Sequence, residues 1–287
     1  NILGSRPKSR QEKKRQVQVA RRSLKVMAGT FVLTVSLILC MVFVPKKNAL
    51  DTLQKRETKA KETGKMTEEQ LAKQKANGSE SDDTICTADL TDDEILEGLN
   101  LLLIGDSIAV DVTDDFYEMF PNSVSDTKIG RITSLGKQVL DSYIDEKKWE
   151  GEGVIFASLS NSPINGELED IREKIGKDMP LFLTTVRIPH ETFEEESNSK
   201  IKKFVEENDH TYLIDWYAVS EGHDEYFDAD DTHMLSAGAK AYAKCIKEAV
   251  LDAYKKENIE IPKSRLVSST DTSTDSSNDS STNASTE

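Results

Sequence analysis

The sequence is poor in the two residue types that most often bind transition metals. It has three cysteines and four histidines among 287 residues, and no Cys/His cluster has the spacing of metal ligands. We therefore expect no metal site in this chain. The shortage of histidine also shortens the search for a catalytic base, because only four positions, His190, His210, His223 and His233, qualify.

The net charge changes sign after the first 25 residues. Those residues have nine basic side chains against one acid, a charge of +8, and the whole chain has a charge of −15, so the other 262 residues have −23. Such a split predicts two compartments or a charged tail rather than one evenly mixed globule. The acidic part would repel a phosphate backbone, so nucleic acid is not expected as a partner.

Long apolar runs are also few, and one of them stands out. The segment Val26–Val44 has no charged side chain and is about as long as the hydrocarbon core of a bilayer requires. The alternative is a buried core helix, but soluble helices rarely stay apolar all round for this length. The basic flank predicts that residues 1–25 are cytosolic and that the chain after Pro45 lies outside. We therefore expect a protein anchored in the lipid bilayer.

The cysteines leave two alternatives open. Cys40 lies inside the apolar run, whereas Cys86 and Cys245 would both be extracellular, where a disulfide between them is possible. Cys245 also shares an apolar helical face with Tyr242 and Ile246, which favours a free thiol in a core. The chain opens with NILGS rather than with methionine, and we expect an upstream part with further membrane helices.

Polar segments frame one folded domain. Residues 45–88 are rich in charged and amide side chains and contain no aromatic residue, so they predict an extended or partly helical extracellular tether. The Ser/Thr/Asp-rich residues 264–287 predict a disordered tail. Between them, residues 89–263 form the predicted domain.

This domain alternates strand and helix patterns. Apolar runs of strand length occupy 100–105, 123–130, 153–160, 181–186 and 211–216, and helical patterns lie near 91–98, 108–119, 131–146, 166–176, 192–207 and 236–256. The alternation predicts an α/β fold with a mostly parallel five-stranded sheet covered by helices on both faces. Sites in such sheets form beyond the carboxyl ends of the strands.

The stretch LLLIGDSIAVDV places Ser107 at such an end, where a buried strand turns into a helix. A serine hydroxyl is a good nucleophile only when a histidine takes its proton and a third group orients that histidine. His233 lies in the loop before the last helix, three residues after Asp230, whose carboxylate can therefore reach the histidine Nδ1. Asp228 and Asp231 are rival partners for this role.

A third signal is Asn161 in LSNSPI, directly after the strand pattern 153–158. Its amide can donate to an oxyanion beside the backbone N–H groups of Ser107 and of a loop glycine such as Gly130. Each signal has an ordinary alternative, since Gly-Asp-Ser is common in loops and asparagine after a strand is usual turn chemistry. Their joint occurrence at strand ends makes the catalytic interpretation more specific.

The four blocks GDS, KIG, SNS and DDTH appear in the order typical of the SGNH hydrolase superfamily. Three further stretches, NSPI, TVRIPHETFEEESN and LIDWYAVSEGHDEYFDADDTHMLSAGAKAYA, resemble the extracellular domain of OatA-type peptidoglycan O-acetyltransferases. In that family an acyltransferase family 3 membrane domain of many helices precedes a last membrane helix, a tether and the SGNH domain. The resemblance implies a three-layer α/β/α, flavodoxin-like SGNH domain.

The resemblance also implies roles for single residues. Ser107 would be the nucleophile, His233 the general base and Asp230 its orienting partner, with an oxyanion hole formed by Ser107, Gly130 and Asn161. Two positions depart from the family pattern, because Leu159-Ser160 replaces a glycine-threonine pair and Ser162 replaces a glycine. These departures affect which backbone N–H groups point inward.

Two further residues near the motifs have open roles. Arg187, in the VRIP stretch, would line a substrate groove, or it would pair with one of the nearby glutamates. Asp106, beside the nucleophile, is expected to cap the turn there.

The function implied is transfer of acetyl, through an acetyl-serine, to the 6-hydroxyl of N-acetylmuramic acid in peptidoglycan glycan strands. The domain itself would need no cofactor, because the upstream membrane domain would deliver an acetyl group derived from acetyl-CoA. One alternative is a membrane-anchored SGNH esterase that removes acetyl groups with water as acceptor. Another is a silent wall-binding module, which is disfavoured because all three triad positions are filled.

Overall fold

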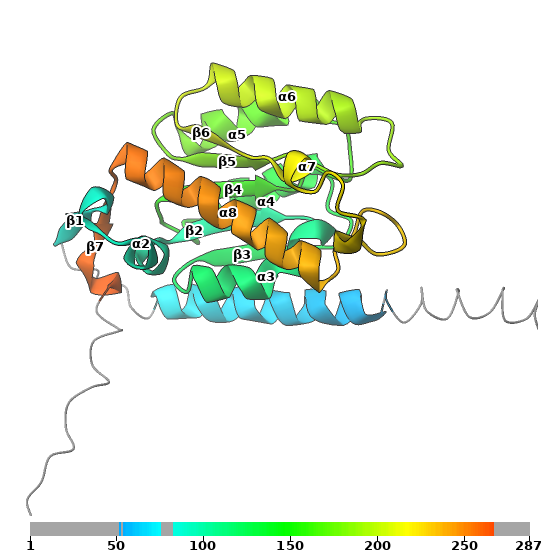
Figure 1. Ribbon diagram of the computed structural model, residues 1–287. Helices are drawn as coiled ribbons and strands as arrows, with labels where there is room; N and C mark the ends of the chain where they lie inside the picture. Colours follow the sequence, from blue (N-terminus) through cyan, green and yellow to red (C-terminus); the bar gives the residue numbers. More distant parts are fainter. Residues whose placement is uncertain (1–51, 53, 76–82, 267–287) are drawn as a thin grey trace, which may run out of the picture. The chain divides into compact units, whose positions relative to one another are not determined.

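The computed structural model describes residue 52, residues 54–75 and residues 83–266 (Figure 1). The fold described below belongs to one compact unit that begins at Arg56. The predicted basic segment 1–25, the predicted membrane helix 26–44 and the chain after residue 266 lie outside the described residues. Among the residues that are described, no helix combines the length and the apolar character needed to cross a bilayer.

A five-stranded sheet forms the centre of the fold, and all its strands run parallel (Figure 1). The strands are β2 (Leu101–Gly105), β3 (Val124–Thr127), β4 (Gly153–Ala157), β5 (Leu181–Thr184) and β6 (Thr211–Ile214), in the order β3-β2-β4-β5-β6. Gly105 pairs with Thr127 on one side and with Ala157 on the other. Three strands therefore end at the same edge, and the predicted parallel sheet is confirmed.

The helices connect consecutive strands, as the sequence pattern predicts. They are α2 (Asp92–Gly98), α3 (Ser107–Met119), α4 (Thr133–Asp145), α5 (Glu167–Ile175), α6 (Glu194–Glu207), α7 (Trp216–Val219) and α8 (Ser236–Glu257), with short 3₁₀ turns η1 (Thr87–Asp89), η2 (Asp224–Tyr226) and η3 (Lys263–Arg265). α2 begins with a capping box in which Thr91 and Glu94 each accept a backbone N–H from the other. The turn α7 and the 3₁₀ turns were not predicted, because they are too short to show a hydrophobic period.

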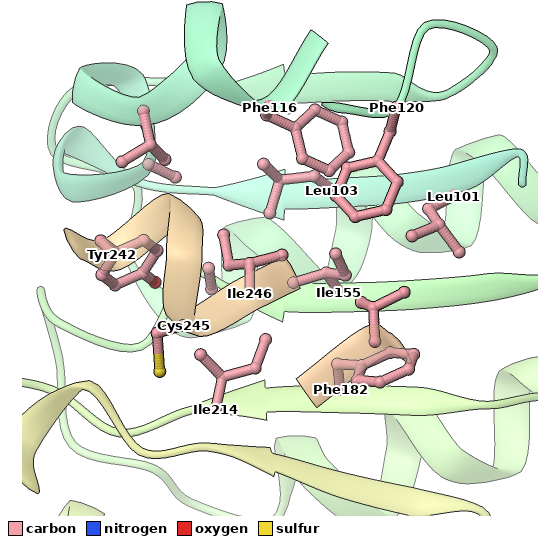
Figure 2. Packing of buried hydrophobic residues seen from close by; sticks show 14 of the residues in the cluster. Leu101, Leu103, Phe116, Phe120, Ile155, Phe182, Ile214, Tyr242, Cys245 and Ile246 are labelled. Atoms are coloured by element: carbon pink, nitrogen blue, oxygen red, sulfur yellow. The ribbon is translucent and has the colours of Figure 1, made fainter. Parts of the chain in front are cut away.

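Two apolar layers hold the helices on the sheet. Alternate strand residues such as Leu101 and Leu103 point toward α3 and α8, where they meet a cluster that includes Phe116, Phe120, Ile155, Phe182, Ile214, Tyr242 and Ile246 (Figure 2). Their neighbours Leu102 and Ile104 belong to a second cluster, with residues of α4, α5 and α6. Because side chains alternate across a strand, the two clusters lie on opposite faces, which gives three α/β/α layers.

Segments on both sides of the predicted domain 89–263 also pack on it. Residues 54–75, within the predicted tether 45–88, form a helix that lies along α3 (Figure 1), and we call it the tether helix. β1 (Thr84–Cys86) pairs antiparallel with β7 (Glu260–Pro262). Just after the predicted end of the domain at residue 263, Arg265 binds the Glu152 carboxylate at 2.7 Å. Polar contacts, together with apolar side chains such as Met66 and Leu266 that pack against the core, attach these segments to the domain.

Both described cysteines are free thiols. Cys245 is buried in the core between α8 and the sheet (Figure 2), where burial raises the pKa of its thiol to about 11. Cys86 is partly buried in β1. Of the two alternatives left open by the sequence, the structure therefore has the core cysteine and not the disulfide.

We predict that Gly105→Ala destabilises the domain, because an added Cβ would lie 2.2 Å from the Ala109 Cβ at the start of α3. Overpacking of this kind costs about 1–3 kcal/mol. The measurement is the free energy of unfolding in urea. Gly64→Ala in the tether helix is the matched control, because nothing lies within 4 Å of its Cβ position and alanine favours a helix by about 1 kcal/mol. Equal stability of wild type and Gly105→Ala would contradict the prediction.

Candidate active site

Ser107 is the first residue of α3, directly after the central strand β2. Its side chain is almost buried, with 7% of the residue exposed. In the described part of the chain no acceptor takes a hydrogen bond from the Ser107 backbone N–H. The first N–H groups of a helix lack partners within the helix and lie at the positive end of its dipole. This N–H is therefore available to an oxyanion formed at the serine.

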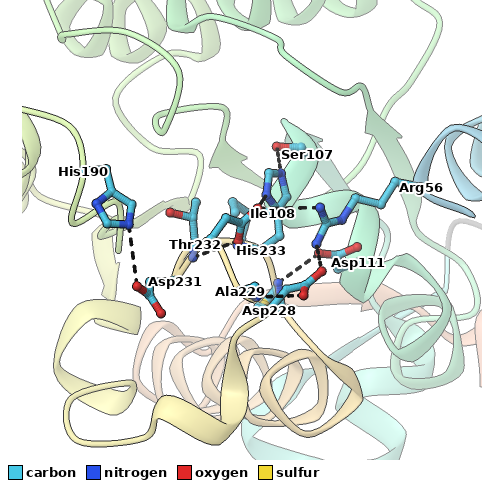
Figure 3. A network of polar contacts seen from close by, with 12 residues as sticks. Arg56, Ser107, Ile108, Asp111, His190, Asp228, Ala229, Asp231, Thr232 and His233 are labelled. Carbon is cyan, nitrogen blue, oxygen red and sulfur yellow. Dashed lines mark hydrogen bonds and ion pairs between the residues drawn. The ribbon is translucent and has the colours of Figure 1, made fainter. Parts of the chain in front are cut away.

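His233 lies beside Ser107 (Figure 3), and Asp230 completes a hydrogen-bonded series with them. The His233 Nε2 lies 3.0 Å from the Ser107 Oγ, and the His233 Nδ1 lies 2.7 Å from the Asp230 Oδ2. The Asp230 Oδ1 accepts the backbone N–H groups of Thr232 and His233. Burial raises the pKa of Asp230, but these hydrogen bonds and the charge of His233 outweigh burial, and the pKa lies below its usual value. The carboxylate is therefore ionised at neutral pH and faces the imidazole.

The two rival acids have other partners. Asp228 accepts a hydrogen bond from the Arg56 guanidinium at 3.1 Å, and its backbone N–H donates to the His233 carbonyl. Asp231 has a positive φ of 52°, and its carboxylate lies 3.6 Å from the His190 Nε2 (Figure 3). The structure thus selects Asp230, which spacing alone left open.

Asp106 links the nucleophile to the loop after β4. Its Oδ1 caps α3 by accepting the Ile108 N–H at 3.0 Å. Its Oδ2 accepts both the backbone N–H and the hydroxyl of Ser160, at 3.0 and 2.5 Å. Complete burial raises the pKa of Asp106, and the hydrogen bonds from Ser160 and Ile108 offset only part of that effect. Asp106 therefore caps the turn, as expected, and also orders the Ser160 loop.

The two other candidate oxyanion donors lie on loops that flank the end of β2. Gly130 follows β3 with a left-handed φ of 68°, and Asn161 follows β4 and donates its Nδ2 to the Ser160 Oγ at 3.2 Å. Both residues are exposed. The described contacts join neither residue to Ser107, so their part in an oxyanion hole stays a prediction.

Arg187 lines a narrow cleft beside Asp106 and Ile108, which flank the nucleophile. Ile108, Ser160 and Trp216 are among the other residues that line it. The guanidinium lies over the ring of Phe227, 5.6 Å from its centroid. Its Nε is buried and has no hydrogen-bond partner within the described residues. The described contacts include no ion pair between Arg187 and a glutamate, and its part in a substrate groove stays a prediction.

The remaining histidines are occupied away from the triad. The His223 ring stacks on Tyr226 with centroids 4.4 Å apart and bonds Glu225 at 2.8 Å. His210 bonds Glu257, also at 2.8 Å. Neither residue contacts Ser107 in the described structure, and His233 is the base that the geometry offers.

Sequence analysis missed two residues next to the triad. Arg56, in the tether helix, approaches both Asp228 and Asp230. Asp111, in α3, accepts the backbone N–H of Met234 at 3.2 Å. A signal for Arg56 did exist, because the residues of the tether helix that contact the domain recur at spacings of three and four. They are Arg56, Lys59, Thr67, Gln70 and Gln74, with Thr63 between them.

The sequence is similar to that of a known O-acetyltransferase. Over 146 residues the sequence is 32% identical to O-acetyltransferase OatA of Staphylococcus aureus (strain NCTC 8325 / PS 47), and the alignment covers 50% of this chain. This chain is homologous to OatA. The chain spans only 24% of the length of that relative. No family model matches the chain.

A solved structure shows the same fold. It is the C-terminal catalytic domain of Streptococcus pneumoniae peptidoglycan O-acetyltransferase A (OatA) with a methylsulfonyl adduct, matched with a TM-score of 0.50 and 22% identity. The match covers 54% of this chain and 94% of that domain. Together with the S. aureus relative, it confirms the resemblance to OatA-type proteins inferred from the motifs.

We predict that Asp230→Asn lowers kcat by about three to four orders of magnitude, the loss typical of the orienting acid of a triad. In the variant the asparagine amide can donate a hydrogen bond to the His233 Nδ1. This favours the histidine tautomer with its proton on Nε2, and that nitrogen then cannot take the serine proton. The measurement is hydrolysis of an activated acetyl ester. Asp231→Asn, which changes the acid beside His190, should stay within about twofold of wild type. Equal losses in the two variants would exclude Asp230 as the partner of His233.

Proposed function

We propose that this chain contains the catalytic domain of an O-acetyltransferase that transfers acetyl to the 6-hydroxyl of N-acetylmuramic acid in peptidoglycan. The observation that carries the proposal is the hydrogen-bonded series from Ser107 through His233 to Asp230, with distances of 3.0 and 2.7 Å. The homology to OatA over 146 residues supports the choice of reaction.

In the first step the Ser107 Oγ attacks the carbonyl carbon of an acetyl donor. The His233 Nε2 takes the hydroxyl proton, and the Asp230 carboxylate stabilises the imidazolium that forms. The tetrahedral oxyanion accepts the Ser107 N–H, and we assign the Gly130 N–H and the Asn161 amide as further donors. When the tetrahedral intermediate collapses, the bond to the donor breaks and His233 returns the proton to the leaving group. The product is acetyl-serine at Ser107.

In the second step the sugar hydroxyl attacks the acetyl-serine. His233 takes the proton of the 6-hydroxyl, a second oxyanion forms in the same place, and the Ser107 oxygen leaves with the proton from His233. The acetyl group is then an ester of the sugar, and the serine is regenerated. Water in place of the sugar gives the esterase reaction, so the two activities differ only in what reaches the acyl-enzyme.

The proposed arrangement in the cell follows the charge pattern of the sequence. Residues 1–25 would be cytosolic, 26–44 would cross the bilayer, and the catalytic domain would be extracellular. The acetyl group, ultimately from acetyl-CoA, would be delivered by an upstream acyltransferase membrane domain. The catalytic residues themselves need no cofactor, because serine, histidine and aspartate complete the chemistry.

We assign Arg187 to the acceptor side of the site. It lines the cleft beside Ser107, and its Nε lacks a partner in the described structure. A guanidinium presents several N–H donors in a fixed plane. It can therefore bind the hydroxyl and carbonyl oxygens of a muramoyl sugar without taking part in the proton transfers.

We predict that an activated acetyl ester acetylates Ser107, with a burst of leaving group followed by slower turnover. The measurement is rapid-mixing kinetics on the full chain in detergent, with peptide mass spectrometry of the region that contains Ser107. Ser107→Ala should abolish the modification, because no other hydroxyl contacts His233 Nε2 in the described structure. Labelling at a different serine would overturn the proposal.

The molecule that accepts the acetyl group distinguishes the proposed acetyltransferase from an esterase. Muramoyl oligosaccharides should take the acetyl group faster than water does if the chain is a transferase. Hydrolysis alone, together with removal of acetyl from pre-acetylated glycan, would identify an esterase instead.

We also predict that Arg187→Ala raises the KM for the muramoyl acceptor about tenfold or more, as expected for loss of a charged hydrogen bond. Hydrolysis of the activated ester by water should change much less, because the triad is untouched. Circular dichroism checks the fold, since the guanidinium also stacks on Phe227. Equal losses of transfer and hydrolysis would remove Arg187 from the acceptor groove.

A further inference from the structure

The tether helix is attached to the catalytic domain along its length by polar contacts. At one end, Gln74 donates to the Asn100 side chain at 3.0 Å and to the Asn122 carbonyl at 2.9 Å. In the middle, the buried Thr67 hydroxyl donates to the Ser125 carbonyl at 2.5 Å. Nearer its start, the Lys59 Nζ donates to the Asp111 carbonyl at 2.7 Å. These contacts fix both the position and the rotation of the helix on α3 and β3.

That rotation directs Arg56 into the loop that holds the catalytic histidine (Figure 3). The Nη2 lies 3.1 Å from the Asp228 Oδ2, and the Nη1 lies 3.7 Å from the Asp230 Oδ2. The Asp230 Oδ2 is the same oxygen that faces the His233 Nδ1. The Arg56 side chain is only 13% exposed. One guanidinium therefore spans two carboxylates of the loop, one of them the acid of the triad.

Backbone hydrogen bonds of the loop connect the Arg56 contact to His233. The Asp228 N–H donates to the His233 carbonyl at 2.8 Å, so the backbone connects Asp228 directly to His233. On the other side of His233, the Met234 N–H donates to the Asp111 carboxylate. Arg56 also faces Asp111, where its charge opposes the burial that raises the pKa of that carboxyl. The loop is thus held on both sides of His233.

The Arg56 guanidinium lies among three carboxylates. Asp111, Asp228 and Asp230 gather round one end of the loop, and like charges at such distances repel. The Arg56 guanidinium offsets part of this repulsion. Arginine suits this place because its planar fork presents Nη1 and Nη2 to two different carboxylates, whereas a lysine has a single ammonium nitrogen for both.

We propose that Arg56 is a positioning residue for the catalytic triad, and that the tether helix is therefore a working part of the catalytic domain rather than a spacer. Arg56 touches no reacting atom. It acts through Asp228 and Asp230, which set where the His233 ring lies relative to the Ser107 Oγ. The inference rests on the proposed serine chemistry, but it needs neither the acetyl donor nor the glycan acceptor to be identified.

The test uses Arg56→Ala and Arg56→Lys in the full chain in detergent. The first readout is the rate at which methanesulfonyl fluoride modifies Ser107, measured by mass spectrometry of the intact protein. This reaction needs an aligned triad but no sugar. The second is kcat and KM for an activated acetyl ester. Arg56→Ala should slow both the modification and kcat by about ten- to a hundredfold, as expected for a small misplacement of a catalytic group. The KM should stay within about twofold, and Arg56→Lys should recover part of the loss.

Gln74→Ala is the matched control. It removes two hydrogen bonds from the same helix but lies away from the loop, so it should lower the thermal midpoint and leave kcat unchanged. Asp228→Asn and Arg56→Ala together form a double-mutant cycle. Arg56→Ala should lower kcat by a smaller factor in the Asp228→Asn background, because the main partner of Arg56 is already altered there. The proposal would be overturned if Arg56→Ala reacted with the fluoride and turned over the ester at wild-type rates. It would also be overturned if Gln74→Ala lost as much kcat as Arg56→Ala. If Ser107 in the wild type reacts with the fluoride but transfers no acetyl, the proposed acetyltransferase fails while the role of Arg56 is still decided.

Discussion

The carboxylate of Asp106 is the constraint around which the site is arranged. It is completely buried at the end of β2, where a charge is tolerated only if donors surround it. Three donors do so, the backbone N–H of Ile108 and both the N–H and the hydroxyl of Ser160. The same carboxylate therefore starts the helix that presents Ser107 and holds the loop that follows β4. Removal of any of these donors would leave a buried acid partly unsatisfied, so the nucleophile and the Ser160 loop depend on each other.

The histidine reaches the serine by a different route. Ser107 and His233 are separated by 126 residues, and their contact depends on α8, which packs Tyr242 and Ile246 against the sheet and fixes the loop before it. The loop is anchored at both ends by Phe227 and Met234, which pair with each other and belong to the same buried cluster. Between these ends its carboxylates bind backbone N–H groups, and two of them also lie close to the Arg56 guanidinium. The serine side of the site is thus positioned by the core, and the histidine side is positioned by buried loop ends together with electrostatic contacts inside the loop.

That difference explains what the sequence could predict. The strands, the capping box at Thr91 and the layer arrangement follow from apolar period and local capping, which are properties of neighbouring residues. The pair Ser107 and His233 could be found because histidine is rare and both residues lie at element ends. The choice of Asp230 over its neighbours needed the fold of the loop, in which Asp230 folds back on the N–H groups of Thr232 and His233. The sequence left residues 45–88 as an extended or partly helical tether. The attachment of its helix to the domain was not predicted, because most of the contacting residues are arginine, lysine, threonine and glutamine, although Met66 and Leu71 also pack against the apolar clusters.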